Sequence, residues 1–544
     1  MQMVERIFEK FAIITAAAIG IYMLAVSMRL GPGVGGDAVI YITSAKNLLA
    51  GNGLGLVNPA GDFRLLPYFP PFYPLFLAFF GLLGFSIAKI AGILNIVLFA
   101  LTIILIGLWI QRTTKNSVAS FLGSLLLACS PILIPAYSWA MSEPLCIFLG
   151  TTGLILFDRY LEYHTPRSLI GSAICCGLSF LTRYSAAAYI AMGGIFLLCF
   201  QKQELKKRIS SAFQFGLISI FPMILWLVYD LQKTATVASR SMLQGTDFNA
   251  ELTRFNEQMK SVFLQWLIPD SWIENPVYPA WINEILYVFV ILLPLVSLLY
   301  GIFRNLRKRS SVPEQWIPRM DNMLLLLSGF FFIYWIVIFG VSVMTFPPIT
   351  IGPRMFTPIH VAFLWLLAIL FAWINMALKK KPYLRVISMI LLFGFTAFYG
   401  LRAIRIAHQN AIDGLGYHAV RWQESEVVDY LRENVPQDQL IVTNEETALL
   451  FLMDRTSWPM HEVYVQEPDP DFYHYETGPV KATDFGRAAF QRGEALLVVF
   501  DSFEDQMQGI YGENTKTRIS TLLENLQVVF DGDDGTIYRL NQDS

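Results

Sequence analysis

The stretch GGDAVIY at residues 35–41 follows closely on an apolar run, FAIITAAAIGIYMLAVSMRL, at residues 11–30. A helix of about 20 mainly apolar residues is long enough to cross a hydrocarbon core of roughly 30 Å. An acidic side chain costs roughly 2.5–3.5 kcal/mol at the centre of such a helix and less toward its ends. We therefore predict that Asp37 lies just beyond a first membrane span, where a retained acid usually has a function.

Similar apolar windows recur as far as about residue 402. The chain is 55% hydrophobic and 15% charged, which excludes a soluble globular protein. The apolar run at residues 72–85 is too short to span and is predicted to be an interfacial helix. We predict a polytopic α-helical membrane protein with about eleven transmembrane helices, at residues 11–30, 87–110, 117–135, 142–160, 169–181, 185–200, 211–229, 282–303, 323–343, 355–378 and 386–401.

The positions of Lys and Arg predict the orientation, because cytoplasmic loops are enriched in both. Basic residues cluster on alternate loops, at residues 6–10, 112–115, 159–167, 202–208, 304–309 and 379–385. An odd number of spans then leaves the N-terminus in the cytoplasm and the C-terminal part outside, as in a multi-pass protein of the cell inner (plasma) membrane. The net charge of -2 gives no signal for a nucleic-acid partner.

Two domains follow from this pattern. Residues 1–402 form the transmembrane domain, with outer loops at 31–71 and 231–281. Residues 403–544 are predicted to form an extracytoplasmic α/β domain. Its predicted elements are a helix at 421–433, strands beginning at 439 and 495, a helix at 515–525 and a terminal hairpin with strands at 528 and 536.

A series of short motifs resembles the GT-C glycosyltransferases, most closely the bacterial protein O-mannosyltransferase and lipid A aminoarabinose transferase group. The motifs are GDAVIY at residues 36–41, LLAGNGL at 48–54, PPFYP at 70–74, SEPL at 142–145, LTRY at 181–184 and GPRMFTP at 352–358. Each motif is short, and it is their order along about the first four hundred residues that makes the resemblance specific.

The resemblance implies an inverting enzyme that takes a sugar from a polyprenyl phosphate donor and transfers it to a lipid, glycan or protein acceptor at the outer face of the bilayer. Asp37 matches the catalytic acid of the family's first outer loop, where a carboxylate can accept the proton of the attacking hydroxyl. Asp37 could instead be the N-cap of a helix beginning near Ala38.

Glu143 opens the span that begins at Ser142 and is predicted to lie on the same membrane face as Asp37. The resemblance implies a second catalytic acid here, and a divalent cation held by Asp37 and Glu143. Oxygen ligands suit Mg or Mn, and Zn remains open. The alternative is structural, because an acid in the first turn of a helix stabilises its positive end.

Arg183 and Arg354 are also predicted at outer ends of spans. The resemblance implies that both bind the donor phosphate, although the aromatic residue after Arg354 follows one place later than in the family pattern. Snorkelling to lipid headgroups, or pairing with Asp37 or Glu143, would explain the same positions. Tyr41, Arg64 and Tyr68 are candidates for lining the donor site, with anchoring at the membrane interface as the alternative.

Two other classes of function fit a chain with many spans. A transporter or flippase of lipid-linked sugars would carry its charges within the spans. The four charged residues Asp37, Glu143, Arg183 and Arg354 are instead predicted at the ends of spans. A non-catalytic assembly protein of the cell envelope would use the C-terminal domain to bind a partner, and its function would not depend on Asp37.

Overall fold

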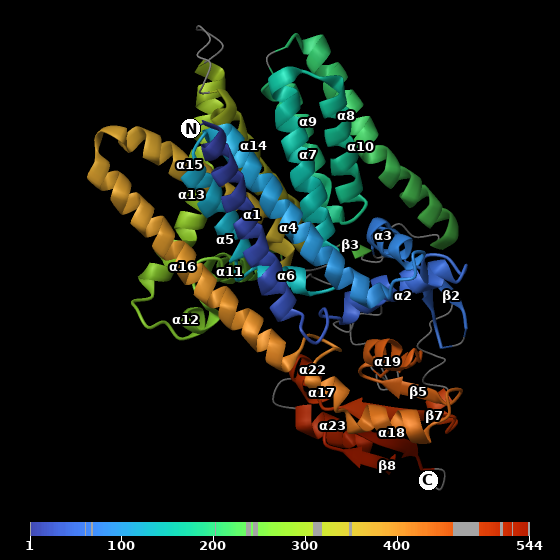
Figure 1. The fold of residues 1–544 in the computed structure, drawn as a ribbon. Coiled ribbons are helices and arrows are strands. Elements are labelled where there is room, and N and C mark those ends of the chain that lie inside the picture. Colours follow the sequence, from blue (N-terminus) through green and yellow to red (C-terminus); the bar gives the residue numbers. More distant parts are fainter. Residues whose placement is uncertain are drawn as a thin grey trace.

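A bundle of long helices carries a small sheet domain at one end in the computed structural model (Figure 1). We call this end of the bundle the domain end. The described residues are 2–59, 61–66, 69–201, 203–234, 241–242, 248–307, 318–346, 351–460, 489–511, 515–524 and 526–541.

Each of the eleven predicted spans overlaps at least one helix. Eight helices among the described residues are long and apolar enough to cross a membrane: α1 (Gln2–Ser27), α4 (Ile87–Thr114), α7 (Glu143–Tyr163), α10 (Leu205–Thr234), α13 (Trp281–Arg307), α14 (Pro318–Met344), α15 (Thr357–Ala377) and α16 (Pro382–Asp413). The other three predicted spans contain shorter helices, α5 (Ser117–Ala128), α8 (Pro166–Phe180) and α9 (Ala187–Cys199).

The predicted span at residues 117–135 is broken in the structure. Helix α5 ends at Ala128, and the short helix α6 (Leu133–Ser138) begins after Ser130 and Pro131. Pro131 cannot donate a backbone hydrogen bond, and the Ser130 hydroxyl accepts from the amides of Ile132 and Leu133 instead. This break turns the chain toward the residues that precede Glu143.

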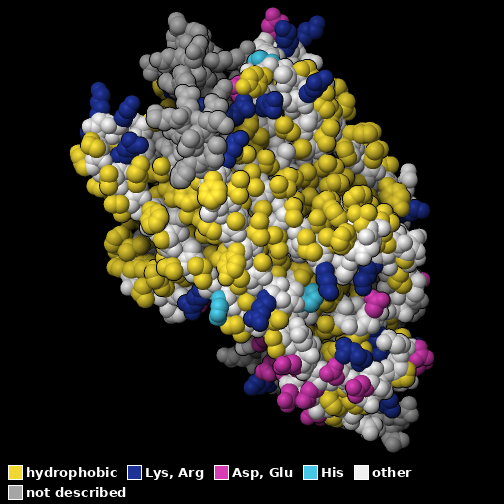
Figure 2. Space-filling view, in the orientation of Figure 1, with side chains coloured by type: hydrophobic (Ala, Val, Ile, Leu, Met, Phe, Trp, Pro, Cys, Tyr) yellow, Lys and Arg dark blue, Asp and Glu magenta, His cyan; other side chains and the backbone are white. Residues whose placement is uncertain are grey.

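Apolar side chains form a broad belt around the bundle, whereas acidic side chains in the same view gather on the C-terminal domain (Figure 2). Helices α10, α13 and α16 contribute large exposed residues to the belt, such as Phe213, Leu299 and Leu391. Because water would not favour so much exposed apolar surface, the belt is the part of the protein that lipid covers. The chain is a multi-pass membrane protein.

The first predicted outer loop is ordered at the domain end. It contains α2 (Gly36–Leu49), an antiparallel pair of strands, β1 (Gly55–Val57) and β2 (Phe63–Leu65), and α3 (Phe72–Gly81). The first loop is therefore partly helical, and the short helix predicted at residues 72–85 is present as α3. The hairpin was not predicted, because its two strands of three residues lack a long alternating pattern.

The second long loop contains α11 (Phe248–Gln265) and the short helix α12 (Asp270–Glu274). Helix α11 buries Phe255, Met259 and Phe263 at helical spacing and contacts α13 and α14. The two-residue strand β3 (Ser241–Met242) pairs with β4 (Thr345–Phe346), close in sequence to Arg354. Before Arg354, the amide of Ile351 donates to Gln258 Oε1 of α11. The second loop therefore supports the segment that carries Arg354.

The C-terminal domain is a five-stranded mixed sheet in the order β6-β5-β7-β9-β8. Strands β5, β6 and β7 are parallel, and β9 is antiparallel to both β7 and β8. The elements of the domain are α17 (Val420–Gln423), α18 (Glu426–Asn434), β5 (Leu440–Thr443), α19 (Glu446–Met453), β6 (Trp458–Pro459), β7 (Ala495–Phe500), α22 (Ser502–Tyr511), α23 (Thr515–Leu523), β8 (Leu526–Gly532) and β9 (Gly535–Leu540).

The predicted elements of this domain are present, with one difference. The helix predicted at 421–433 is divided into α17 and α18, because the Ser425 hydroxyl caps α18 by accepting from the amide of Val428. One face of the sheet, including Ile441 and Leu496, joins the apolar cluster that continues into the helix bundle. The domain therefore packs against the bundle through a continuous core.

Glu446, at the start of α19, leads to a prediction about pH. Burial raises the pKa of Glu446 to about 7, and the nearby Glu445 carboxylate adds to the rise. Between the pKa of an unfolded glutamate, about 4.3, and about 7, the folded state keeps a proton that the unfolded state loses. The free energy of unfolding should therefore fall as the pH rises through this window.

We expect Glu446→Gln to remove this pH dependence and to raise the unfolding temperature at pH 8 by about 2–4 °C, the shift that roughly 1 kcal/mol produces. Unfolding should be followed in detergent at pH 5 and pH 8. The exposed Glu433→Gln is the matched control, and equal curves for Glu446→Gln and the wild type would contradict the prediction.

Candidate active site

Asp37 lies in the first turn of α2. The helix begins at Gly36, and its N-cap is Gly35, with an extended backbone at φ -164° and ψ 179°. The N-cap alternative for Asp37 is therefore wrong, because the cap position belongs to Gly35. The segment before the helix runs against Trp139, and a Cβ atom on Gly33 would come within 2.5 Å of the indole ring. Glycine is needed for this close approach, which fixes where the helix of Asp37 begins.

Glu143 is the first residue of α7, after the N-cap Ser142. Its side chain is only 1% exposed, so it lies inside the protein and not at a membrane surface. The hydroxyl of Ser142 does not cap the helix. It accepts from Arg183 Nη1 at 3.0 Å and lies 3.4 Å from the hydroxyl of Tyr41. The side chains of Ser142 and Glu143, at the start of α7, thus both face the site.

Two arginines meet these acids. Arg183 precedes the 3-10 helix η1 (Tyr184–Ala186), and Arg354 lies in the 3-10 helix η3 (Pro353–Phe356). Arg354 Nη2 is 3.0 Å from Asp37 Oδ2, and Arg354 Nε is 3.1 Å from Glu143 Oε1. Arg183 Nη1 is 2.9 Å from the same Glu143 oxygen. We call Asp37, Glu143, Arg183 and Arg354 the paired-charge cluster.

The cluster has a buried half and an open half. The side chains of Glu143 and Arg183 are 1% and 19% exposed, whereas those of Asp37 and Arg354 are 37% and 40% exposed. Burial lowers the pKa of Arg183, but the Glu143 carboxylate and further neighbouring groups, led by Tyr41, together outweigh burial, and the pKa lies above its ordinary value. Two positive charges balance two negative ones, and an incoming molecule can reach Asp37 and Arg354.

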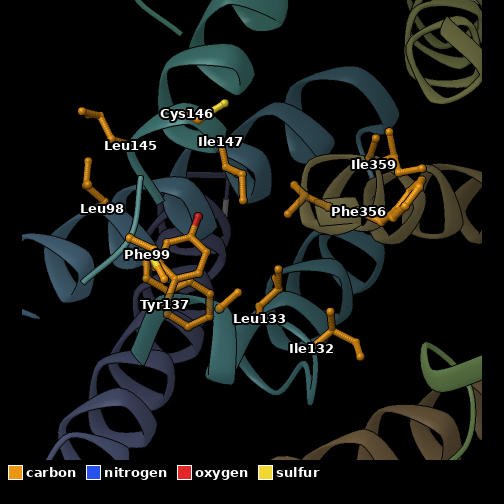
Figure 3. Packing of buried hydrophobic residues seen from close by; sticks show 14 of the residues in the cluster. Leu98, Phe99, Ile132, Leu133, Tyr137, Leu145, Cys146, Ile147, Phe356 and Ile359 are labelled. Atoms are coloured by element: carbon orange, nitrogen blue, oxygen red, sulfur yellow. The ribbon is translucent and has the colours of Figure 1, made fainter. Parts of the chain in front are cut away.

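The apolar core begins directly behind the cluster. Figure 3 shows Leu145, Cys146 and Ile147 of α7 near the rings and aliphatic groups of α4 and α6, together with Phe356 at the end of η3 and Ile359 of α15. Phe356 and Ile359 are fully buried. Because the residues that follow Glu143 and Arg354 are fixed in close-packed surroundings, the cluster stands on a rigid support.

The three residues predicted to line the donor site have different outcomes. Tyr41 is 2% exposed, packs edge-on against Phe69 and Tyr73, and reaches Ser142 beside the cluster. It is thus buried beside the site and is not an interface anchor. Burial raises the pKa of Tyr41, so its hydroxyl stays neutral. Arg64 belongs to β2, but its side chain, like the whole of Tyr68, lies outside the described residues.

Tyr334 of α14 is a supporting residue that the sequence did not reveal. Its hydroxyl hydrogen-bonds to the carbonyl of Met355, at 2.7 Å, and to the hydroxyl of Ser185, at 3.2 Å. Met355 follows Arg354, and Ser185 lies two residues after Arg183. Tyr334 therefore joins the two segments that carry the arginines. Within an apolar span, nothing in the sequence distinguishes it from neighbouring aromatic residues.

We expect Tyr334→Phe to lower the activity that depends on Arg183 and Arg354 by about tenfold, because a misplacement of about 1 Å in an active site is costly. Turnover and protein stability should be measured together. Tyr399→Phe is the matched control, because it also removes a buried hydroxyl, one that donates to the carbonyl of Trp266. Equal losses of activity in both variants would indicate a general effect on folding.

The predicted cation at Asp37 and Glu143 would bind two acids that also contact arginines. Asp37 Oδ2 and Glu143 Oε1 already contact guanidinium groups, and two carboxylates are few ligands for Mg, Mn or Zn. The described part of the chain contains no group of three or more His, Cys, Asp or Glu side chains placed to hold a metal ion. The cation at Asp37 and Glu143 therefore stays a prediction that this structure does not test.

Comparison with known families finds one match, to the family described as dolichyl-phosphate-mannose-protein mannosyltransferase, over residues 69–226. This range includes Glu143 and Arg183 and excludes Asp37 and Arg354. No curated protein sequence matches the chain.

Solved structures match over nearly the whole chain. ArnT from Cupriavidus metallidurans, bound to undecaprenyl phosphate, matches with a TM-score of 0.53 and 12% identity, covering 97% of each chain. The oligosaccharyltransferase AglB from Archaeoglobus fulgidus, in complex with an inhibitory peptide and a dolichol-phosphate, matches with a TM-score of 0.56 and 11% identity. That match covers 99% of this chain and 75% of AglB.

These matches confirm the predicted resemblance at the level of the fold. The chain is a polytopic helical protein with a C-terminal α/β domain that shares the fold of ArnT and AglB, and the match to ArnT extends through both parts.

Proposed function

We propose that this protein is an inverting glycosyltransferase that moves a sugar from a polyprenyl phosphate donor to an acceptor at the domain end of the bundle. The observation that carries the proposal is the contact of Asp37 with Arg354, on the open half of the paired-charge cluster. It puts a proton acceptor beside a phosphate-binding group, which is what such a transfer needs. The lipid phosphates bound to ArnT and AglB support the donor class.

In the proposed reaction, an acceptor hydroxyl or amine attacks the anomeric carbon from the side opposite the phosphate. The bond from carbon to phosphate oxygen breaks as the new glycosidic bond forms, so the configuration inverts. The proton of the acceptor passes to Asp37, and the bonding electrons leave with the polyprenyl phosphate. No covalent intermediate with the protein is required.

Arg354 would exchange a carboxylate partner for the donor phosphate. In the structure it contacts Asp37 and Glu143, and its side chain is 40% exposed. Negative charge grows on the phosphate as the sugar leaves, and a fixed guanidinium stabilises that charge most strongly in the transition state. Arg183, held by Glu143 and Ser142, supplies the second positive charge behind it.

The orientation remains part of the proposal. The alternating basic loops favour a cytoplasmic N-terminus and an extracytoplasmic C-terminal domain in the plasma membrane. Protease added outside intact cells should then cleave the C-terminal domain and leave the bundle. Protection of the domain in intact cells would reverse the orientation.

The test of function is the transfer of radiolabelled sugar from a panel of polyprenyl phosphate donors in proteoliposomes, with the anomeric configuration of the product determined by NMR. Consumption of one donor with inversion supports the proposal. Movement of intact donor across the bilayer without cleavage favours a lipid-linked-sugar transporter. Neither activity, with any donor or acceptor, favours a non-catalytic assembly role.

The same assay tests the cation. Because two arginines already balance the two acids, we expect transfer to continue after treatment with EDTA, and added Mg, Mn or Zn to have little effect. Loss of activity in EDTA that one of these ions restores, in a protein whose unfolding temperature is unchanged, would support a cation at Asp37 and Glu143. The buffer and lipid composition should be held constant.

A further inference from the structure

The chain that leads into the helix of Asp37 is joined on two sides by isolated backbone bridges, which lie outside the named strands. On one side, the amide of Gly33 donates to the carbonyl of Ser138, and the amide of Ala140 donates to the carbonyl of Gly33, both at 2.8 Å. On the other side, the amide of Tyr417 donates to the carbonyl of Val34 at 2.7 Å. Both pairings are parallel bridges.

The two neighbours of this segment come from different parts of the protein. Ser138 to Ala140 connects α6 to the start of α7, so it ends just before Glu143. Residues 416–418 connect α16 to the C-terminal domain, and we call them the linker strand. The segment before Asp37 is therefore held between the chain that leads to the second acid and the chain that enters the C-terminal domain.

The contact with the linker strand is too close for ordinary side chains. Gly416 has a φ of +55°, and a Cβ atom there would lie 2.0 Å from the carbonyl oxygen of Val34. Only glycine allows the two backbones to approach in this way. Tyr417 connects the linker strand to the domain, because its hydroxyl lies 2.6 Å from the hydroxyl of Thr447 in α19.

His418 adds a side-chain contact. Its Nδ1 lies 2.7 Å from the carbonyl oxygen of Pro32. A carbonyl can only accept, so Nδ1 carries the proton and donates. The ring also packs edge-on against Phe451 of α19, at 5.2 Å between ring centres. His418 thus ties the segment before Asp37 to the C-terminal domain through one hydrogen bond and one aromatic contact.

A salt bridge makes a second connection between the same parts, but a weaker one. Lys46 Nζ of α2 is 3.1 Å from Asp454 Oδ1, with side chains 48% and 78% exposed. An ion pair so open to water contributes little. The buried backbone pairing of the linker strand is therefore the stronger connection between the domain and the helix of Asp37.

We propose that the linker strand is a positioning element of the active site, through which the C-terminal domain sets the place of Asp37 relative to Arg354. The domain then acts on the transfer step, and not only on access of the acceptor. The proposal rests on the proposed function, because it gives Asp37 its catalytic role. Its structural half, that the linker strand holds residues 32–37 in place, can be tested without substrate.

The experiment compares His418→Leu with His418→Asn in the full-length protein. An asparagine amide nitrogen can stand close to the position of Nδ1 and donate to Pro32, whereas leucine cannot donate. His408→Leu is the control, because His408 is an exposed histidine of α16 near the same end of the chain. Thermal unfolding identifies any variant that is generally destabilised, and Gly416→Ala provides a second, backbone-directed change.

For His418→Leu we expect kcat to fall about tenfold to a hundredfold, as expected for a misplaced catalytic group, with the KM for the donor nearly unchanged. Amide hydrogen exchange at residues 32–39 should become faster. His418→Asn should recover most of the kcat and most of the protection from exchange at residues 32–39. His408→Leu should match the wild type in both measurements. If His418 only stabilised the fold, His418→Leu would lower the amount of folded enzyme, and His418→Asn would not specifically restore slow exchange at residues 32–39.

Two results would overturn the proposal. The first is unchanged exchange at residues 32–39 in both His418→Leu and Gly416→Ala. The second is faster exchange with kcat unchanged, which would mean that the linker strand holds the segment but does not affect catalysis. If the wild-type protein transfers no sugar from any donor, the proposed function fails, and hydrogen exchange alone still decides whether the linker strand positions Asp37.

Discussion

Replacing Asp37 by Asn should lower sugar transfer by about a hundredfold to ten-thousandfold, the contribution of a positioned general base. Asparagine keeps the shape of the side chain, and its carbonyl oxygen can still accept from Arg354. It cannot take the proton of the acceptor. The donor KM should therefore change little while kcat falls, as measured with radiolabelled donor under saturating acceptor.

A matched control lies in the same loop. Asp62 is exposed, and its carboxylate is 3.4 Å from the side-chain amide of Asn58. Asp62→Asn removes one negative charge near the domain end without touching the paired-charge cluster, and it should leave transfer close to that of the wild type. Retention of most activity by Asp37→Asn, in a protein that unfolds at the same temperature, would remove Asp37 from the mechanism.

The acids and arginines of the site could be predicted from the sequence because charge is rare near membrane spans. Asp37 and Glu143 each stand beside a long apolar run, and so do Arg183 and Arg354. Pairing of these arginines with Asp37 or Glu143 was one alternative that the sequence offered, and the structure shows it, but the sequence could not tell which arginine meets which acid. Asp37 and Arg354 are 317 residues apart in the chain, and only the packing of the bundle brings them together. The sequence also could not tell that Arg354 contacts both acids.

The supporting residues lack such a signal. Tyr334 lies among aromatic residues of an apolar helix, and His418 lies in a linker between domains. Each acts through a hydrogen bond to a backbone carbonyl, of Met355 and Pro32 respectively. Backbone groups of distant segments have no trace in the pattern of side chains. Residues of this kind become visible only when the three-dimensional arrangement is known.

The sequence predicted the positions of the helices better than the residues at which they end. The apolar pattern indicates where helices lie, because the side chains of a membrane-spanning helix face either lipid or the protein core and are apolar in both cases. It does not show where a helix ends if the flanking residues are also apolar. Helix α5 stops at Ala128 within such a run, where Ser130 and Pro131 begin the turn toward α6. The same turn carries the chain to the segment beside Gly33.

Arg354→Ala should lower transfer by about a hundredfold or more, because loss of one preorganised donor to a developing charge typically costs on the order of 2.7–4 kcal/mol. Arg354→Lys should recover part of this, since lysine keeps the charge but cannot hold two partners in the fork geometry of arginine. The affinity for polyprenyl phosphate itself should be highest in the wild type, lower in Arg354→Lys and lowest in Arg354→Ala. Arg385→Ala is the control, because Arg385 is an exposed arginine near the start of α16, and this helix begins at the end of the bundle away from the C-terminal domain (Figure 1).

A second substitution separates phosphate binding from charge balance. Arg354 is one of two guanidinium groups on the buried Glu143 carboxylate, so its removal also leaves that carboxylate with less compensation. If charge balance were the main role, Glu143→Gln would restore activity in the Arg354→Ala background. If Arg354 binds the leaving phosphate, the double variant should unfold at a higher temperature than Arg354→Ala yet remain inactive. Recovery of transfer in the double variant would contradict the proposed role of Arg354.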